Sequence, residues 1–235
     1  MYGKQGLKYY EGLLAENPEN EMIDYLVGEM DFAVSQGADK PFFRVVAHSD
    51  TFIHAVGAYG MIVASFDGGN TWINREHTVV NYNFNHLFDV TRLPNGKFFM
   101  CGEVGVAIEG DINTQTSVAV STPWEGSFFT CTTAADGSVV MGGLRGKVFR
   151  TTDNARSWTP SKKPATASIV DSLVMSDGRI LLVAQNGELL VSSNNGKSFT
   201  SLMKGLGVAG SIAEVDQNTL LVAGATGIRK VTLDQ

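Results

Sequence analysis

The sequence predicts an all-β fold built from one repeated antiparallel unit, and three observations support this fold class. Glycine is frequent, with 26 among 235 residues, and charged residues make up only 18%, whereas an average soluble protein has about 7% glycine and about 25% charged residues. Hydrophobic residues reach 43%, which is enough for a core and excludes a disordered chain. The strongest observation is that glycines between apolar runs return at a nearly constant interval. Together these features indicate many short strands joined by tight turns.

The repeat is marked by one glycine between two strand-like runs in each unit. These glycines, spaced 45, 41, 41 and 40 residues apart, are Gly60, Gly105, Gly146, Gly187 and Gly227. Upstream turn sequences such as Asp136-Gly137 and Asp177-Gly178 keep the same phase, and such pairs favour tight hairpins. Each unit is therefore expected to form four short antiparallel strands joined by turns.

A second motif follows the repeat glycine and predicts a structural turn. Its polar residues can accept backbone N–H bonds, its small residue permits a tight backbone, and its aromatic residue can anchor against a neighbouring unit. In each copy the hydroxyl residue lies five positions after the glycine, and the aromatic residue lies seven positions further on. The residues of the three copies are Ser65, Asp67, Gly69, Thr71 and Trp72; Thr151, Asp153, Ser157 and Trp158; and Ser192, Asn194, Gly196 and Phe199.

This motif resembles the Asp-box, or BNR, repeat, S-x-D-x-G-x-T-W, which lies between the third and fourth strands of propeller blades. The copy that begins at Ser65 matches fully, the second departs at Ala155, and the third departs at Asn194 and Phe199. The chain as a whole resembles the propellers of photosystem II stability and assembly factors and the related short propellers of bacteria and tailed phages. The resemblance implies a β-propeller.

The repeat divides residues 1–235 into a single domain of six expected blades. Their approximate bounds are 6–42, 43–86, 87–126, 127–167, 168–208 and 209–235, and residues 1–5 are expected to add the missing outer strand of the last blade. The first unit is degenerate, but Ser35 to Phe42 keep the interval of the second motif. Closing the ring with an N-terminal strand would leave no unpaired central edge.

Five blades preceded by an N-terminal extension are the alternative. In this interpretation Asn17-Pro18 caps a helix, since proline is favoured at the first helical position. The helix would present one apolar face made of Met22, Ile23, Leu26, Val27, Met30 and Ala33. A helix over residues 18–35 would favour this alternative.

Charge and cysteine content exclude several function classes. The net charge of −6 argues against nucleic acid as a partner, because phosphates require a basic surface. No apolar run is long enough to insert into a membrane and no leader opens the chain, so a virion or cytoplasmic location is expected. Cys101 and Cys131 are expected to be buried free thiols. His48 and His54 flank a hairpin and could face each other, but the spacing indicates no metal site.

Two further groups of residues bear on possible sites. Arg145, Lys147, Arg150 and Arg156 surround one blade and form a candidate partner patch, analogous to the arginines that the resemblance implies in partner docking. Phenylalanine doublets begin several strands: Phe42-Phe43, Phe98-Phe99 and Phe128-Phe129. Because stacked blades cover both faces of a sheet, both members of each doublet are expected in the core.

The sequence favours a non-catalytic interaction or scaffold protein that is a structural subunit of a larger assembly, by resemblance a tail or capsid-associated phage virion protein. No catalytic or metal-binding residue and no cofactor is expected, and the expected partners are other protein subunits. One alternative is a bacterial assembly factor of the photosystem II assembly-factor-like family. The other is a glycan-binding or sialidase-like glycosidase, but none of the eight arginines lies in the Arg-Ile-Pro context of sialidases.

Overall fold

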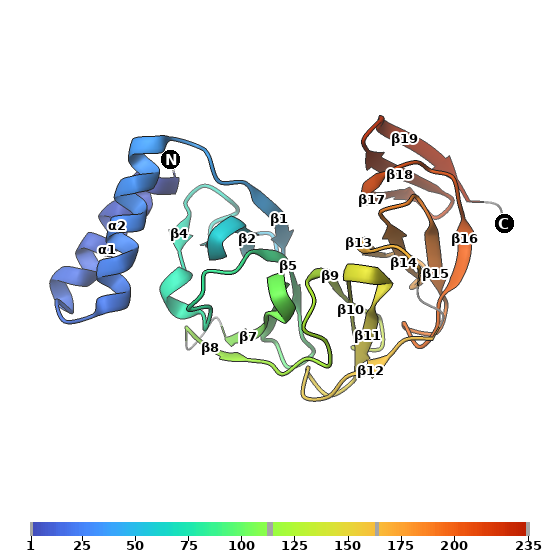
Figure 1. The fold of residues 1–235 in the computed structure, drawn as a ribbon, viewed down its shortest axis with the longest axis horizontal. Helices are drawn as coiled ribbons and strands as arrows, with labels where there is room; N and C mark the ends of the chain where they lie inside the picture. The colour runs from blue at the N-terminus through green and yellow to red at the C-terminus, as the bar shows by residue number, and fades with distance from the viewer. Residues whose placement is uncertain (1, 112–114, 163–164, 234–235) are drawn as a thin grey trace.

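The computed structural model describes residues 2–111, 115–162 and 165–233, and it consists of two helices followed by five antiparallel sheets (Figure 1). The helices are α1 (Tyr2–Glu16) and α2 (Glu21–Gln36). Blade 1 contains β1 (Phe42–Ala47), β2 (Ile53–Gly57), β3 (Ile62–Ser65) and β4 (Ile73–Asn74), and blade 2 contains β5 (Leu87–Arg92), β6 (Phe98–Gly102), β7 (Ala107–Asp111) and β8 (Thr116–Ala119). Blade 3 contains β9 (Phe128–Thr133), β10 (Val139–Gly143), β11 (Val148–Thr151) and β12 (Thr159–Pro160), and blade 4 contains β13 (Ile169–Val174), β14 (Ile180–Ala184), β15 (Leu189–Ser192) and β16 (Thr200–Met203). Blade 5 contains β17 (Ala209–Asp216), β18 (Thr219–Gly224) and β19 (Gly227–Thr232).

The favoured six-blade prediction is wrong, because residues 6–42 form most of a helical hairpin instead of a blade. Asn20 caps α2 by accepting a hydrogen bond from the Ile23 N–H at 3.1 Å, and Gly37 ends α2 with a φ of 83°. The buried residues of α2 recur at helical spacing: Ile23, Leu26, Met30 and Ala33. The alternative of five blades after an N-terminal extension is therefore confirmed, although the cap of this helix is Asn20 and not Asn17. The interval from Ser35 to Phe42 is a coincidence of spacing.

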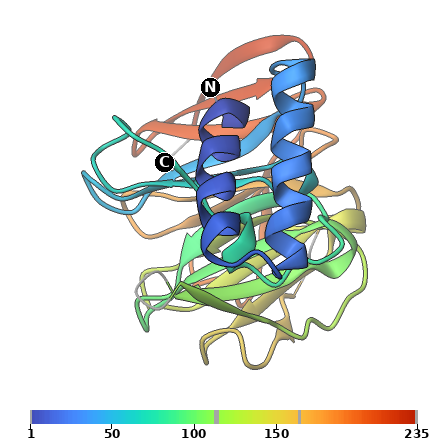
Figure 2. The ribbon, with the colours of Figure 1, turned by 90° about the vertical axis from the view of Figure 1, so that its left-hand side faces the viewer.

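The helical hairpin docks on blade 1 through α1 and does not close the ring. Figure 2 shows α1 and α2 side by side in front of the blades, and α1 packs against β4. The hydroxyls of Tyr2 and Tyr10 both donate to the buried carboxylate of Glu76 at 2.5 Å. Because residues 2–5 belong to α1, they are not the outer strand of the last blade, and the predicted closure by that strand is wrong.

The blades follow one another in an arc around a central channel. Within each blade the strands pair in chain order, and the first strand is the innermost. The inner strands β1, β5, β9, β13 and β17 lie side by side in that order (Figure 1). Apolar clusters fill the space between consecutive blades. This inter-blade packing is the core of the protein.

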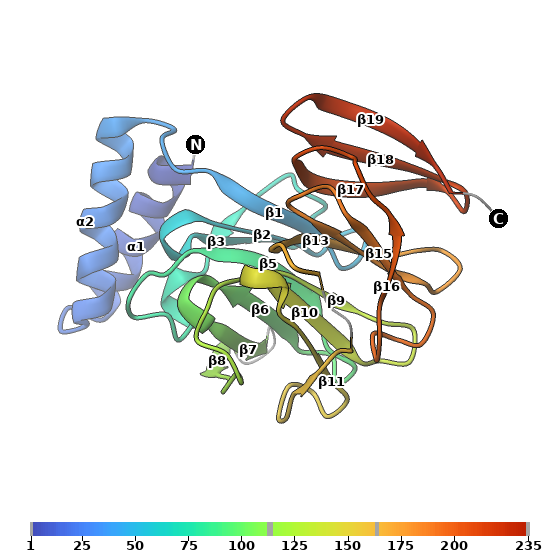
Figure 3. The same cartoon turned by 45° about the vertical axis from the view of Figure 1, so that its right-hand side comes forward.

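Blades 1 and 5 lie at the two ends of the arc, as Figures 1 and 3 show. Val45 on blade 1 is 61% exposed, whereas Val90, at the same position of blade 2, is 2% exposed. Ile228 on blade 5 is 75% exposed, whereas Leu189, at the same position of blade 4, is fully buried. The described residues therefore leave one sheet face of blade 5 uncovered, whereas in blade 1 the exposure concerns β1, because Ala55 and Val63 on the same face are buried.

Candidate functional site

A β-bulge at the start of the inner strand turns one side chain toward the channel in each of blades 1 to 4. The register of β1 shifts between Phe42 and Arg44, so Phe43 has no opposite residue in β2. Equivalent shifts leave Phe88, Phe129 and Val170 without an opposite residue in blades 2, 3 and 4. A bulge re-aims the side chain of its extra residue. Four blades therefore contribute one apolar side chain each to the same end of the channel.

These side chains line the mouth of the channel, a cavity of about 490 Å³. The ring centroid of Phe88 lies 5.3 Å from that of Phe43 and 5.2 Å from that of Phe129. Leu144, Ser168, Val170 and Gln185 complete the lining. Phe42 and Phe43 are 40% and 42% exposed and Phe129 is half-buried, so the expectation that both members of a doublet lie in the core is wrong for these two doublets, whereas Phe98 and Phe99 are both buried as expected. The bulge is the reason, because it points the second phenylalanine away from the inter-blade layer.

Arg44 lies next to the bulge in β1 and joins three blades. Its Nε donates to Asp89 Oδ1 in blade 2 at 2.9 Å, and one of its terminal nitrogens lies 3.1 Å from Asp171 Oδ1 in blade 4. Burial lowers the pKa of Arg44, but the carboxylates of Asp89 and Asp171 outweigh this effect and raise the pKa overall. Burial raises the pKa of Asp89 despite the attraction of Arg44. The guanidinium is occupied by these ion pairs.

The two carboxylates also bind the backbone of the next blade. Asp89 Oδ2 accepts from the Cys131 N–H at 3.0 Å, and Asp171 Oδ2 accepts from the Ile212 N–H at 2.9 Å. The sequence reasoning missed this arrangement. An Asp two positions after the start of the inner strand is the only signal for it in the sequence, and it recurs in blades 2 and 4.

Turns between the second and third strands form the rim of the mouth. Tyr59, Val104 and Arg145 precede a repeat glycine, have φ values of 54°, 51° and 56°, and are exposed. Their backbone N–H groups donate to side chains of the next blade at 2.8 to 3.2 Å, namely His86 Nδ1, Ser127 Oγ and Ser168 Oγ. The turn backbone is thereby fixed, while each side chain projects from the rim.

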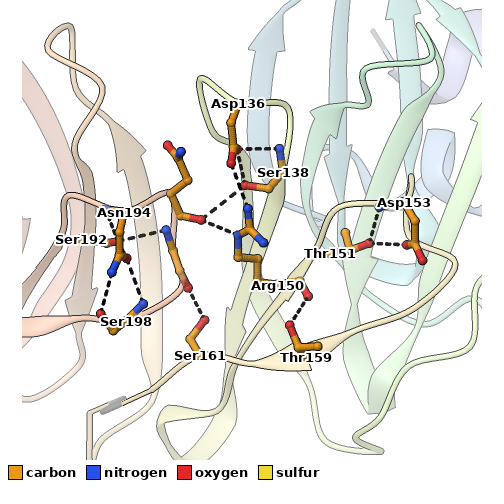
Figure 4. Close-up of polar contacts among 12 residues, drawn as sticks. Asp136, Ser138, Arg150, Thr151, Asp153, Thr159, Ser161, Ser192, Asn194 and Ser198 are labelled. Atoms are coloured by element: carbon orange, nitrogen blue, oxygen red, sulfur yellow. Dashed lines mark hydrogen bonds and ion pairs between the residues drawn. The ribbon is translucent and has the colours of Figure 1, made fainter.

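The Asp-box residues lie at the opposite end of the blades and hold the third turn of each box-containing blade. Ser65 Oγ accepts from the Gly69 N–H and Asp67 Oδ1 accepts from the Thr71 N–H, both at 2.8 Å. The same bonds occur in the other two copies, with Thr151 and Asp153, and with Ser192 and Asn194, and Figure 4 shows Asn194 with Ser198 in the third copy. Two of the aromatic residues pack inward: the ring centroids of Trp158 and Phe99 lie 5.4 Å apart, and Phe199 is fully buried.

The four residues of the candidate partner patch do not form one surface. Arg145 and Lys147 lie in the turn at the mouth, whereas Arg156 lies in the Asp-box turn at the other end of β11. Arg150 donates to Asp136 Oδ2 at 2.9 Å and to the Asn195 carbonyl in blade 4 at 2.6 Å (Figure 4). Arg150 therefore connects two blades, and Arg145 and Lys147 are the members of the group that lie exposed at the mouth.

His54 and the two cysteines are buried, and His48 is half-buried beside His54. His48 Nε2 and His54 Nδ1 lie 3.0 Å apart, and burial, the largest effect on both, lowers the pKa of His48 to about 4 and that of His54 to about 3. Both rings are therefore neutral at pH 7. Cys101 and Cys131 are buried free thiols. Within the ranges that the structure describes, no group of three His, Cys, Asp or Glu side chains could hold a metal ion, and neither helix could span a membrane.

Comparison with protein families gives one match, which covers most of the chain. The family model of the photosynthesis system II assembly factor YCF48, a BNR-repeat family, matches residues 35–217. No curated protein matches the sequence. The matched region contains blades 1 to 4 and the first strand of blade 5, β17.

Solved structures show the same fold at low sequence identity. A structure described as "YCF48 bound to D1 peptide" is 15% identical with a TM-score of 0.60, and the match covers 81% of this chain and 63% of that chain. YCF48 from Cyanidioschyzon merolae is 14% identical with a TM-score of 0.64, over 84% and 68% of the two chains. A streptogramin B lyase is also 14% identical, with a TM-score of 0.63 over 85% and 71%. At these identities the likeness concerns the fold alone, and this chain spans less than two thirds of the first of these relatives.

Proposed function

Because the chain belongs to the family of the photosynthesis system II assembly factor YCF48, we propose that it is a non-catalytic propeller that binds an extended segment of a protein partner at the channel mouth. The observation that carries this proposal is the aromatic cavity to which four blades contribute. Such a cavity suits the apolar side chains of a peptide, because aromatic residues provide large contact areas. A YCF48 structure with a bound D1 peptide supports the same class of ligand.

An assembly factor, the alternative derived from the sequence, has more support than the virion subunit that the sequence favoured. The family match and the YCF48 structures support the former, and no comparison supports a phage tail or capsid role. The virion or cytoplasmic location stays a prediction.

A non-catalytic function is supported by the composition of the mouth. Its lining consists of aromatic and aliphatic residues with one serine and one glutamine, and Arg44 is engaged by Asp89 and Asp171. None of these groups pairs a nucleophile with a general base. The streptogramin B lyase shares the fold, but a fold does not determine chemistry.

Selection of peptides from a random phage-displayed library, followed by fluorescence anisotropy with the selected peptide, tests this function. Phe43→Ala is expected to weaken binding about tenfold or more, because it removes an aromatic contact worth roughly 1–2 kcal/mol. Phe66→Ala is the matched control, since Phe66 is also 42% exposed but lies in the Asp-box turn at the other end of blade 1. A library that yields no binder, or equal losses in the two variants, would refute the proposal.

A further inference from the structure

The outer edge of β19 is unpaired in the described part of the chain. In blades 1 to 4 the third strand pairs with a fourth strand, as β15 does with β16. In blade 5, over the described ranges up to residue 233, β19 pairs only with β18. A free strand edge carries backbone N–H and C=O groups that can pair with another extended segment. Blade 5 therefore has a position for one more strand.

The exposed face of blade 5 has the chemistry of a buried face. In blade 4 the corresponding face consists of Leu181, Val183 and Leu189, all fully buried under blade 5. The same register positions in blade 5 are Leu221, Ala223 and Ile228, with Lys230 opposite Leu221 at the edge of the face, and Ile228 is the most exposed of the large hydrophobic residues that the structure describes. An added strand would therefore find an apolar neighbour in Ile228 at this edge.

The positive charge of β19 favours an acidic partner. Arg229 and Lys230 are exposed on this strand, at positions that Leu190 and Val191 occupy in β15. Neither β18 nor β19 contains an acidic residue. If two copies of the protein paired β19 along its full length in antiparallel fashion, Arg229 would lie opposite Lys230 of the second copy. Like charges in opposite positions are destabilising, so a second copy is disfavoured and an acidic strand is favoured.

We propose that β19 binds an extended acidic segment of a partner protein as the fourth strand of blade 5. In blade 4, Leu189, Leu190 and Val191 lie opposite Met203, Ser201 and Thr200, with a bulge between the first two pairs. Transferred to β19, this register places an acidic residue opposite Lys230, another opposite Arg229, one unpaired residue, and an apolar residue opposite Ile228. The segment that binds therefore reads acidic-acidic-x-apolar, from its N-terminus to its C-terminus.

A charge-swap experiment on the full chain tests the proposal. Two fluorescein-labelled twelve-residue peptides that differ only in a Glu-Glu-Ser-Leu or a Lys-Lys-Ser-Leu core are titrated by fluorescence anisotropy. The wild type is expected to bind the acidic peptide about tenfold more tightly, because two cross-strand charge pairs change sign. The double variant Arg229→Glu/Lys230→Glu is expected to prefer the basic peptide by a similar factor. Equal binding of both peptides by the wild type, or an unchanged preference in the double variant, would overturn the proposal.

Amide hydrogen exchange locates the bound peptide and separates this site from the channel mouth. The acidic peptide is expected to protect the backbone amides of residues 228–232, and Phe43→Ala is expected to leave this binding unchanged. A peptide that protects only strands at the mouth would overturn the inference about β19 while leaving the function proposed for the mouth intact. A dimer in sedimentation analysis with β19 protected in the absence of peptide would also overturn it, because the occupant would then be a second copy.

Discussion

Substitution of Arg44 by methionine is expected to destabilise the whole propeller, because Arg44 joins blades 1, 2 and 4. The change leaves Asp89 and Asp171 without their cation, and their side chains are only 2% and 5% exposed. Breaking a buried ion pair by removing one partner costs about 3–5 kcal/mol. Each carboxylate keeps three other hydrogen-bond donors, so the lower end of this range, about 3 kcal/mol, is expected.

Urea denaturation followed by tryptophan fluorescence measures this loss. In a domain of this size about 3 kcal/mol corresponds to a fall in Tm of roughly 6–12 °C. Arg179→Met is the matched control, because Arg179 pairs with Asp177 at 2.6 Å but both side chains are 29% exposed, and such surface pairs contribute about 0–1 kcal/mol. The triple variant Arg44→Met/Asp89→Asn/Asp171→Asn is expected to recover part of the lost stability, since it removes the uncompensated charges. A loss below about 1 kcal/mol for Arg44→Met would refute the argument.

Three other changes test the turns and the helical hairpin. Gly146→Ala is expected to lower the free energy of unfolding by more than about 3 kcal/mol, because φ is 69° and the new Cβ would lie 2.0 Å from a backbone oxygen. Gly178→Ala is the control: φ is 88° but the space is open, so only the backbone strain of about 1–2 kcal/mol is expected. Equal urea midpoints of the two variants would contradict this. Hydrogen bonds from Thr71 and Ser65 lower the pKa of Asp67 from 3.8 to about 2, so the stabilisation from this carboxylate is present above about pH 4 and lost as the pH falls toward 2. The Tm difference between wild type and Asp67→Asn should shrink over that interval, and a constant difference would count against it. Glu76→Gln removes one of the two oxygens that accept from the Tyr2 and Tyr10 hydroxyls, at a cost of about 1–3 kcal/mol. Faster amide hydrogen exchange over residues 2–16 is therefore expected. Unchanged exchange would show that the helical hairpin docks by apolar contacts alone.

The sequence was sufficient to predict the blades that follow residue 42, because their signals are local. Turn glycines and Asp-box hydroxyls act within a few residues, and the observed strands follow their phase. The N-terminal region carried two conflicting local signals, and the cap at Asn20 together with the apolar face of α2 outweighed the spacing that ended at Phe42. The helix cap, the apolar face of α2 and the contacts of Tyr2 and Tyr10 with Glu76 therefore favour two helices over a sixth blade.

The mouth could not be predicted in the same way, because it depends on pairing between strands. Phe43 and Phe129 look like core residues in sequence, and only the bulge in the pairing of each inner strand turns them to the channel. The bridge from Arg44 to Asp171 joins blades that are distant in the chain. A large apolar residue at one phase of the repeat, as at Phe88, was the available signal for the channel lining.

The rim turns allow recognition to change without a change of scaffold. Val104 is β-branched and adopts a left-handed conformation that glycine or asparagine would adopt more easily. Backbone conformational preference therefore does not explain the valine at this position. Because each turn is held by a hydrogen bond from its own backbone N–H to a side chain of the next blade, the side chains of Tyr59, Val104 and Arg145 can be exchanged independently of one another. A small combinatorial library at these three places would sample many ligand preferences on one rigid support, and relatives that diverge there can acquire new clients while keeping the same architecture.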